Sequence, residues 1–199
     1  MIKYFDIFAG IGGFRSGLEK AVGFECVGYC EIDRYAKKAY ETMYDTEGEV
    51  YYDDARKIDP NELPDFDLIC GGFPCQSFSI AGKRGGFDDA RGTLFFEIAR
   101  IAAVKKPKYL LLENVPGLLS HDSGRTFATI LGSLDELGYD VAWQVLNSAN
   151  FRVAQSRKRV FIIGFLREKC AGKVLSFTDA NPKTLVQRIP GREGCRVYS

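Results

Sequence analysis

The sequence is poor in several features that identify common protein classes. Its 199 residues include a single histidine, one tryptophan and two methionines. No run reaches the roughly 18 apolar residues of a membrane-spanning helix. The 27 basic and 26 acidic side chains give a formal net charge of +1, so no overall basic field points to a polyanionic partner. Any surface for nucleic acid therefore has to be a local patch.

The cysteines do not form a recognisable framework either. Six in a chain of this length are not the dense pattern of a disulfide scaffold. Cys26 and Cys30 stand in an apolar stretch without metal-ligand spacing, and His121 is the only histidine to accompany them. The short apolar N-terminal run contains Asp6 and favours a buried strand over a signal peptide. We expect a cytoplasmic protein with reduced thiols, no metal and no membrane segment.

What is present is an alternation of short apolar runs and amphipathic segments. Such alternation predicts a parallel sheet covered on both faces, whereas the last two strands lack an intervening helix and predict an antiparallel hairpin. We therefore expect an α/β fold, a doubly wound Rossmann-like, mostly parallel sheet with that hairpin at one edge. The predicted strands are Ile2–Phe8, Phe24–Cys30, one ending near Tyr52, Asp67–Cys70, Tyr109–Leu112, Asp140–Asn147 and Arg159–Phe165. The predicted helices are Phe14–Val22, Asp33–Tyr44, Gly92–Lys105 and Gly124–Gly138. In the first, Phe14, Leu18 and Val22 share one apolar face, and in the second Asp33 is the expected N-cap.

The regular pattern ends after Leu166. Residues 167–199 have weak periodicity and a Pro-, Gly- and Arg-rich end, so we expect a domain over 1–166 followed by an irregular tail over 167–199.

The first predicted strand leads into a glycine turn, Phe8-Ala9-Gly10-Ile11-Gly12-Gly13. In doubly wound sheets ligands bind at the carboxyl ends of the strands. Arg15 stands where a dinucleotide fingerprint requires its third glycine, which weakens the pyrophosphate interpretation. Glu31 ends the second strand about where a ribose-binding carboxylate falls, roughly 20 residues past the first glycine. These residues fit a nucleoside cofactor such as S-adenosylmethionine, and equally a tight turn beside surface acids.

Two reactive groups follow other predicted strands. Cys75 lies in "GGFPCQSFS", between a glycine pair and small polar residues, and a thiolate is a strong nucleophile. Glu113 follows three leucines and is a candidate proton donor. Taken alone, Cys75 could equally be a packing residue and Glu113 a loop acid. Together with the glycine turn, they predict an active site at one edge of the sheet.

In these motifs the chain resembles the cytosine-5 DNA methyltransferases. The stretches "DIFAGIGGF", "GGFPCQSFS", "ENVPGLL" and "QSRKRVFIIGF" are similar to that family's motifs and stand in the same order, within about residues 1–165. The resemblance implies a flipped-out cytosine of double-stranded DNA whose ring carbon 6 is attacked by Cys75, while Glu113 protonates ring nitrogen 3. Carbon 5 then takes a methyl group from S-adenosylmethionine, and loss of the carbon-5 proton releases Cys75. Arg159, with Arg157 nearby, would help to hold the base and the thiol.

The resemblance also implies a cofactor site and DNA contacts. The cofactor-binding residues would be Phe8, Gly10, Ile11, Gly13, Glu31, Ile32, Asp54, Ala55, Pro74 and Leu94. Phe8 would contact the adenine, Glu31 the ribose hydroxyls and Asp54 the adenine amino group. Candidates for phosphate contacts are Ser79, Lys83 and Arg91.

The family's target-recognition region and closing helix are not visible in the sequence. This leaves three alternatives open: a subunit completed by a second polypeptide, a truncated and inactive cofactor-binding remnant, or a core active by itself. Methylation of cytosine in transfer RNA is the alternative within enzymes.

Overall fold

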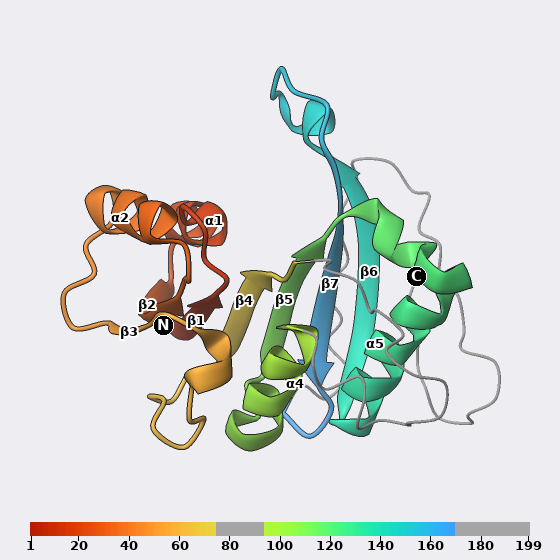
Figure 1. Cartoon of the computed structure of the whole chain (residues 1–199), viewed down its shortest axis with the longest axis horizontal. Coiled ribbons are helices and arrows are strands. Elements are labelled where there is room, and N and C mark those ends of the chain that lie inside the picture. Colours follow the sequence, from red (N-terminus) through yellow and green to blue (C-terminus); the bar gives the residue numbers. More distant parts are fainter. Residues whose placement is uncertain (75–93, 170–199) are drawn as a thin grey trace. The chain divides into compact units, whose positions relative to one another are not determined.

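The computed structural model describes residues 1–74 and 94–169, which belong to two compact units, Met1–Pro107 and Lys108–Ser199. Figure 1 traces the chain through both. The predictions that fall on Cys75, on the candidates Ser79, Lys83 and Arg91, and on the tail from 170 onward lie outside the described residues.

The first unit carries a parallel sheet. Its strands are β1 (Ile2–Ile7), β2 (Phe24–Cys30), β3 (Val50–Tyr52) and β4 (Leu68–Gly72), in the order β3-β2-β1-β4. The central strand β1 is fully buried from Tyr4 to Ile7, as expected of a strand covered on both faces. At Gly71 an added Cβ would lie 2.0 Å from the Ile7 carbonyl oxygen, so only glycine permits this close approach of β4 to β1.

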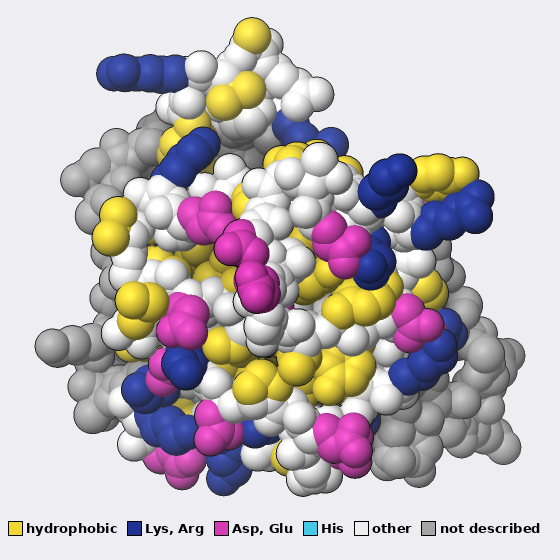
Figure 2. Space-filling model, turned by 90° about the vertical axis from the view of Figure 1, so that its left-hand side faces the viewer, with side chains coloured by type: hydrophobic (Ala, Val, Ile, Leu, Met, Phe, Trp, Pro, Cys, Tyr) yellow, Lys and Arg dark blue, Asp and Glu magenta, His cyan; other side chains and the backbone are white. Residues whose placement is uncertain are grey.

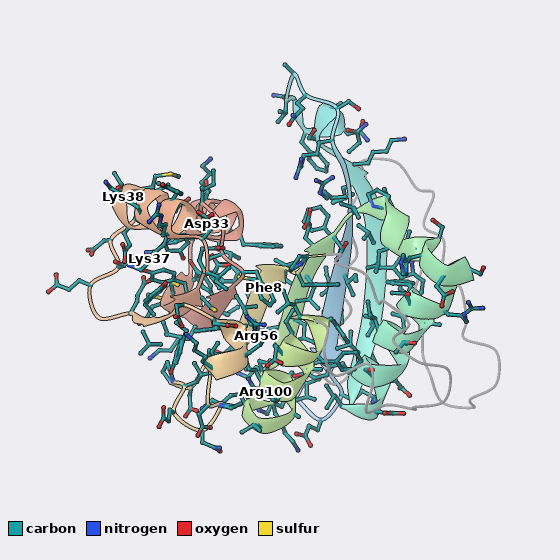
Figure 3. The ribbon with its side chains drawn as sticks, viewed as in Figure 1. Phe8, Asp33, Lys37, Lys38, Arg56 and Arg100 are labelled. Atoms are coloured by element: carbon teal, nitrogen blue, oxygen red, sulfur yellow. The ribbon has the colours of Figure 1, made fainter. Side chains whose placement is uncertain are left out.

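Three helices accompany these strands: α1 (Gly13–Ala21), α2 (Arg34–Met43) and α4 (Leu94–Lys105). Asp33, labelled in Figure 3, is the N-cap predicted for α2, and its Oδ1 accepts hydrogen bonds from the amides of Tyr35 and Ala36, each at 2.8 Å. In α1 the predicted buried face is partly wrong. Val22 is the C-cap residue and is 80% exposed, whereas Arg15 is buried.

The second unit is an antiparallel sheet with one long helix. Its strands are β5 (Tyr109–Asn114), β6 (Tyr139–Asn147) and β7 (Lys158–Leu166), and β7 pairs with both others. The predicted hairpin is confirmed as β6–β7. Strand β5 is longer than predicted, so Glu113 and Asn114 are its last residues and do not follow it. Helix α5 (Arg125–Glu136) packs on β6 through an edge-to-face contact of Phe127 and Trp143, whose ring centroids are 5.2 Å apart.

Short 3-10 turns complete the described chain: Ala55–Lys57, Pro116–Leu119, His121–Gly124 and Ser148–Phe151. Parallel strands with helices in one unit and an antiparallel sheet in the other confirm the predicted α/β class. Over the part of the chain that the structure describes, no helix is long and apolar enough to cross a membrane.

Candidate cofactor and catalytic site

The turn after β1 is built on left-handed backbone. Phe8, Gly10 and Gly12 have φ values of 56°, 57° and 85°, and Phe8 (labelled in Figure 3) adopts this conformation without being glycine. A side chain in this region is strained by about 1–2 kcal/mol, and such strain collects at ligand sites. The turn is fixed by two backbone hydrogen bonds, from Ala9 N–H to the Cys30 carbonyl (3.0 Å) and from Gly12 N–H to the Ala9 carbonyl (2.9 Å).

Glu31 fastens this turn to the end of β2. Its Oε2 accepts a hydrogen bond from the amide of Gly10 at 2.7 Å, and its Oε1 accepts one from the amide of Asp33 at 2.7 Å. A carboxylate has about four acceptor positions, so each oxygen keeps capacity for a further donor. The glycine turn and Glu31 therefore lie together, and a vicinal diol is a ligand that such a carboxylate can bind.

The backbone beside Glu31 is open and its neighbours are apolar. A Cβ added at Gly10 or at Gly13 would meet no atom within 4 Å. The side chains of Ile11 and Ile32, which follow Gly10 and Glu31 in the chain, are 59% and 68% exposed. Exposed aliphatic side chains around an uncovered backbone and a carboxylate match the chemistry of a nucleoside, so these residues fit the adenosine part of S-adenosylmethionine.

Asp54 follows β3 and starts the turn Ala55–Lys57. Its Oδ1 accepts a hydrogen bond from the amide of Arg56 at 3.0 Å, and its Oδ2 lies 2.7 Å from the Arg56 guanidinium. These bonds to Arg56 lower the pKa of Asp54 to about 2, so the carboxylate is ionised at neutral pH. It can accept a hydrogen bond from an amino group. Ala55 is buried, and its carbonyl accepts a hydrogen bond from Arg100 of α4 at 3.1 Å; Arg56 and Arg100 are labelled in Figure 3.

The remaining cofactor candidates lie at the ends of the described stretches. Pro74 is exposed just after β4, and Leu94 is half-buried as the first residue of α4.

Sequence reasoning missed a buried polar network beneath the turn. Arg15 of α1 donates to the Tyr40 hydroxyl (3.3 Å) and to the Glu49 carboxylate (2.8 Å). Tyr40 in turn donates to the buried Asp6 carboxyl at 3.3 Å, and the Cys70 thiol donates to the same carboxyl at 3.7 Å. Burial is the main cause that raises the pKa of Asp6 to about 8. The only advance signals were an aspartate inside an apolar strand and an arginine where a third glycine was sought.

The network reaches the glycine turn through Tyr44. Its hydroxyl donates to the Gly12 carbonyl at 2.9 Å, and the Arg15 guanidinium lies over its ring, 4.8 Å from the centroid. A Cβ at Gly12 would be 2.3 Å from the Tyr44 ring. Glycine is therefore required here both for φ and for space, and the turn is held from Tyr44 as well as from Glu31.

In the second unit two predicted catalytic side chains meet. Arg159 Nε lies 2.6 Å from Glu113 Oε1, and both side chains are about four-fifths buried, with exposed fractions of 20% and 23%. Their strands pair antiparallel, with Glu113 opposite Phe161 and Asn114 opposite Val160, which places the Arg159 side chain at the end of β5. Asn114 is buried, and its Oδ1 accepts a hydrogen bond from the Val115 amide at 2.8 Å. The ion pair fixes the direction of the Glu113 carboxylate.

Arg157 is not part of this pair. It stands just before β7 and its side chain is exposed. Its backbone amide donates a hydrogen bond to the Ser148 hydroxyl at 3.0 Å. Of the predicted catalytic residues, the structure thus brings Glu113 and Arg159 together and leaves Arg157 apart.

These features match a known family. The family model for C-5 cytosine-specific DNA methylase matches residues 2–192. The chain belongs to this family. Among curated relatives, the type II methyltransferase M.NgoBI of Neisseria gonorrhoeae is 51% identical over 165 residues, which cover 83% of this chain and 51% of that protein. M.HaeII of Haemophilus aegyptius is 50% identical over 164 residues, covering 82% and 50%.

A solved structure supports the fold. The S. pombe Dnmt2 methyltransferase superposes with a TM-score of 0.65 at 22% identity, over 83% of this chain and 51% of that one. This similarity confirms the predicted Rossmann-like methyltransferase fold. The chain spans about half the length of the curated relatives it matches.

Proposed function

We propose that this chain supplies the catalytic core of a DNA cytosine-5 methyltransferase that uses S-adenosylmethionine. The observation that carries the proposal is the ion pair of Glu113 and Arg159. It joins residues from two of the motifs by which the sequence resembles the family, and it orients a carboxyl group as proton transfer to a base requires. The family match to a DNA methylase favours DNA over the transfer-RNA alternative.

Cys75 is proposed as the nucleophile. Its sulfur would add to ring carbon 6 of a flipped-out cytosine, which places an electron pair on the ring. Glu113 would donate a proton to ring nitrogen 3, so that the charge does not accumulate and carbon 5 becomes nucleophilic. Bound S-adenosylmethionine supplies the methyl group. Removal of the carbon-5 proton by a base would then expel the Cys75 thiolate, and return of the nitrogen-3 proton to the Glu113 carboxylate would restore neutral 5-methylcytosine.

Arg159 would act through Glu113 and at the base. Its guanidinium keeps the carboxyl group in one orientation and its Nη1 donates to the Lys158 carbonyl at 2.7 Å, while its other N–H donors would bind an acceptor on the base. Arg157, exposed before β7, would contact the substrate only from outside this pair.

The cofactor would be held by the first unit. Glu31 would bind the ribose hydroxyls while it fixes the Gly10 amide, and the ionised Asp54 would accept from the adenine amino group. Apolar contacts would come from Phe8, Ile11, Ile32, Pro74 and Leu94. Close approach of the cofactor to the backbone would be possible at Gly10, Gly13 and Ala55.

Two further predictions belong to this proposal. We place the enzyme in the cytoplasm, where S-adenosylmethionine and DNA are available in a bacterial cell. A second polypeptide carrying a target-recognition region would supply base-edge contacts, because phosphate contacts alone position a protein without reading sequence. The core would then be residues 1–166 and the segment 167–199 the start of that region.

The test is transfer of a labelled methyl group from S-adenosylmethionine to mixed-sequence duplex DNA and to mixed transfer RNA. The chain and its Cys75→Ser and Glu113→Gln variants are compared at equal concentration. We expect label on DNA, abolished by Cys75→Ser and reduced at least about 100-fold by Glu113→Gln. Label on transfer RNA only would overturn the choice of substrate. Label that survives Cys75→Ser would overturn the mechanism.

A further inference from the structure

The β6–β7 hairpin extends beyond the end of its neighbour β5. Strand β5 ends at Asn114, which pairs with Val160, while β6 and β7 continue to pair as far as Asn147 and Lys158. The chain between them, 148–157, forms the tip that projects in Figure 1. We call residues 147–158 the hairpin tip. Within the hairpin tip, every residue from Ala149 to Lys158 is exposed.

The base of the hairpin tip is tied together by several hydrogen bonds. The Ser148 amide donates to the Arg157 carbonyl (3.0 Å) while the Arg157 amide donates to the Ser148 hydroxyl (3.0 Å). The Asn147 side-chain amide donates to the Ser156 hydroxyl at 3.1 Å. The Ser148 hydroxyl also donates to the Gln155 carbonyl. The exposed residues beyond these bonds are therefore presented on a closed loop and not on a free end.

The composition of the hairpin tip is basic and apolar. It contains Arg152, Arg157 and Lys158 and no acidic residue. None of these three side chains has an ion-pair partner within 1–74 and 94–169. Phe151 and Val153 are each 51% exposed. Figure 2 shows hydrophobic and basic side chains together at the top of the view.

Arg152 occupies a backbone conformation that suits glycine. It is the C-cap of the turn Ser148–Phe151, with φ 60° and ψ 29°. Glycine adopts this conformation without strain, and asparagine at little cost. Folding therefore gains nothing from arginine at this position, and an observed strain of this kind points to a function for the side chain. A long cation that has no ion-pair partner among the described residues and stands next to an exposed aromatic ring has the chemistry that binds a nucleic-acid phosphate and the apolar face of its sugar or base.

We propose that the hairpin tip is a DNA-docking surface, on which Arg152 and Lys158 bind backbone phosphates of duplex DNA and Phe151 packs against the adjoining sugar. The proposal rests on the proposed function for its partner, and it adds an anchoring site outside the catalytic residues. Because one phosphate contact releases about one counterion, each basic residue of the surface adds close to one unit to the salt dependence of binding.

The experiment is fluorescence anisotropy of a labelled duplex of mixed sequence, titrated with the full chain at 50, 100 and 200 mM NaCl. The variants are Arg152→Gly, Arg152→Gln and Phe151→Ala. The matched control is Arg125→Gln, which removes one exposed arginine at the start of α5 that is paired with Asp122. Thermal unfolding of each variant is recorded in parallel.

We expect Arg152→Gly to raise the unfolding midpoint and yet to weaken DNA binding, by about tenfold at 50 mM salt, with the deficit shrinking about threefold by 200 mM. Arg152→Gln should weaken binding equally without the gain in stability. Phe151→Ala should weaken binding severalfold with an unchanged salt slope, since no charge is lost. Arg125→Gln should bind like the unmodified chain.

Equal salt slopes for Arg152→Gly and the unmodified chain would overturn the proposal, as would a chain that does not bind duplex DNA. Tighter, Arg152-dependent binding of transfer RNA would overturn the assignment of the partner to duplex DNA. Methyl transfer is assayed separately. A chain that transfers no methyl group but binds DNA through Arg152 would contradict the proposed function and support the docking surface. A chain that transfers the methyl group but binds DNA equally well without Arg152 would support the proposed function and overturn the docking surface.

Discussion

We expect Asp6 to make folding stability depend on pH, and Asp6→Asn to remove its contribution. The carboxyl is fully buried in β1, and burial raises its pKa from 3.8 to about 8 against the opposing hydrogen bonds from Cys70 and Tyr40. The unfolded chain therefore loses this proton near pH 4, while the folded chain keeps it until about pH 8. Between these values the folded state binds more protons, so stability falls as pH rises.

The size of the effect follows from the width of this window. Each pH unit inside it costs about 1.4 kcal/mol for one fully differential proton. From pH 5 to pH 7 the loss attributable to Asp6 approaches about 3 kcal/mol, which is a large part of the 5–15 kcal/mol typical of a domain. At pH 5 the unfolded chain has already lost this proton while the folded chain keeps it, so Asp6→Asn should already be favoured by about 1.5 kcal/mol. Only below about pH 4, where the side chain is neutral in both states of both proteins, should the two differ by no more than about 1 kcal/mol.

The assay is urea unfolding followed by circular dichroism at pH 5, 6, 7 and 8. Other groups that titrate, including the buried Glu49 with its raised pKa, are present in both proteins. The difference between the two free energies therefore isolates Asp6. We expect the advantage of Asp6→Asn to grow with pH and to level off near pH 8. Asp59→Asn, at an exposed aspartate, serves as the control and should follow the unmodified protein. Parallel curves for Asp6→Asn and the unmodified protein would show that the Asp6 carboxyl does not take up a proton on folding.

Three further changes test the glycine turn and the catalytic pair. Gly12→Ala should lower the free energy of unfolding by about 2 kcal/mol or more, because its Cβ would meet the Tyr44 ring at 2.3 Å at a φ of 85°. Gly10→Ala, at φ 57° with open space, should lower it by about 1 kcal/mol, and equal losses in urea unfolding would contradict the clash. Tyr44→Phe removes the bond to the Gly12 carbonyl and should weaken binding of S-adenosylhomocysteine severalfold in calorimetry at a stability cost of about 1 kcal/mol; unchanged affinity would exclude Tyr44 from positioning the turn. Arg159→Lys should lower methyl transfer at least about tenfold because lysine does not reproduce the guanidinium contact with Glu113, and a rate equal to that of the unmodified chain would show that the ion pair is dispensable.

Local patterns were sufficient to predict most elements of the fold. The apolar run Phe24–Cys30 is β2 to the residue, and the N-cap Asp33 was identified because its side chain can satisfy the first amides of a helix. The place of Glu31 at the end of the second strand followed from a general rule, that ligands of doubly wound sheets bind at the carboxyl ends of the strands.

The interactions that depend on tertiary packing were not predictable in this way. A charged residue such as Arg15 is expected on the surface of a helix, and its burial depends on partners from α2 and from the loop before β3, far along the chain. The pairing of Glu113 with Arg159 depends on the register of β5 against β7, which the strand sequences alone do not specify. Resemblance to a family named both residues, but only the structure places them 2.6 Å apart.

We propose that the chain methylates cytosine at carbon 5 through Cys75. The most direct measurement is to incubate duplex DNA with S-adenosylmethionine and either the chain or its Cys75→Ser variant, digest the DNA to nucleosides and quantify 5-methylcytosine by mass spectrometry. We expect 5-methylcytosine with the unmodified chain and none with Cys75→Ser. Equal amounts from both proteins, or methylation at another position of the base, would contradict it.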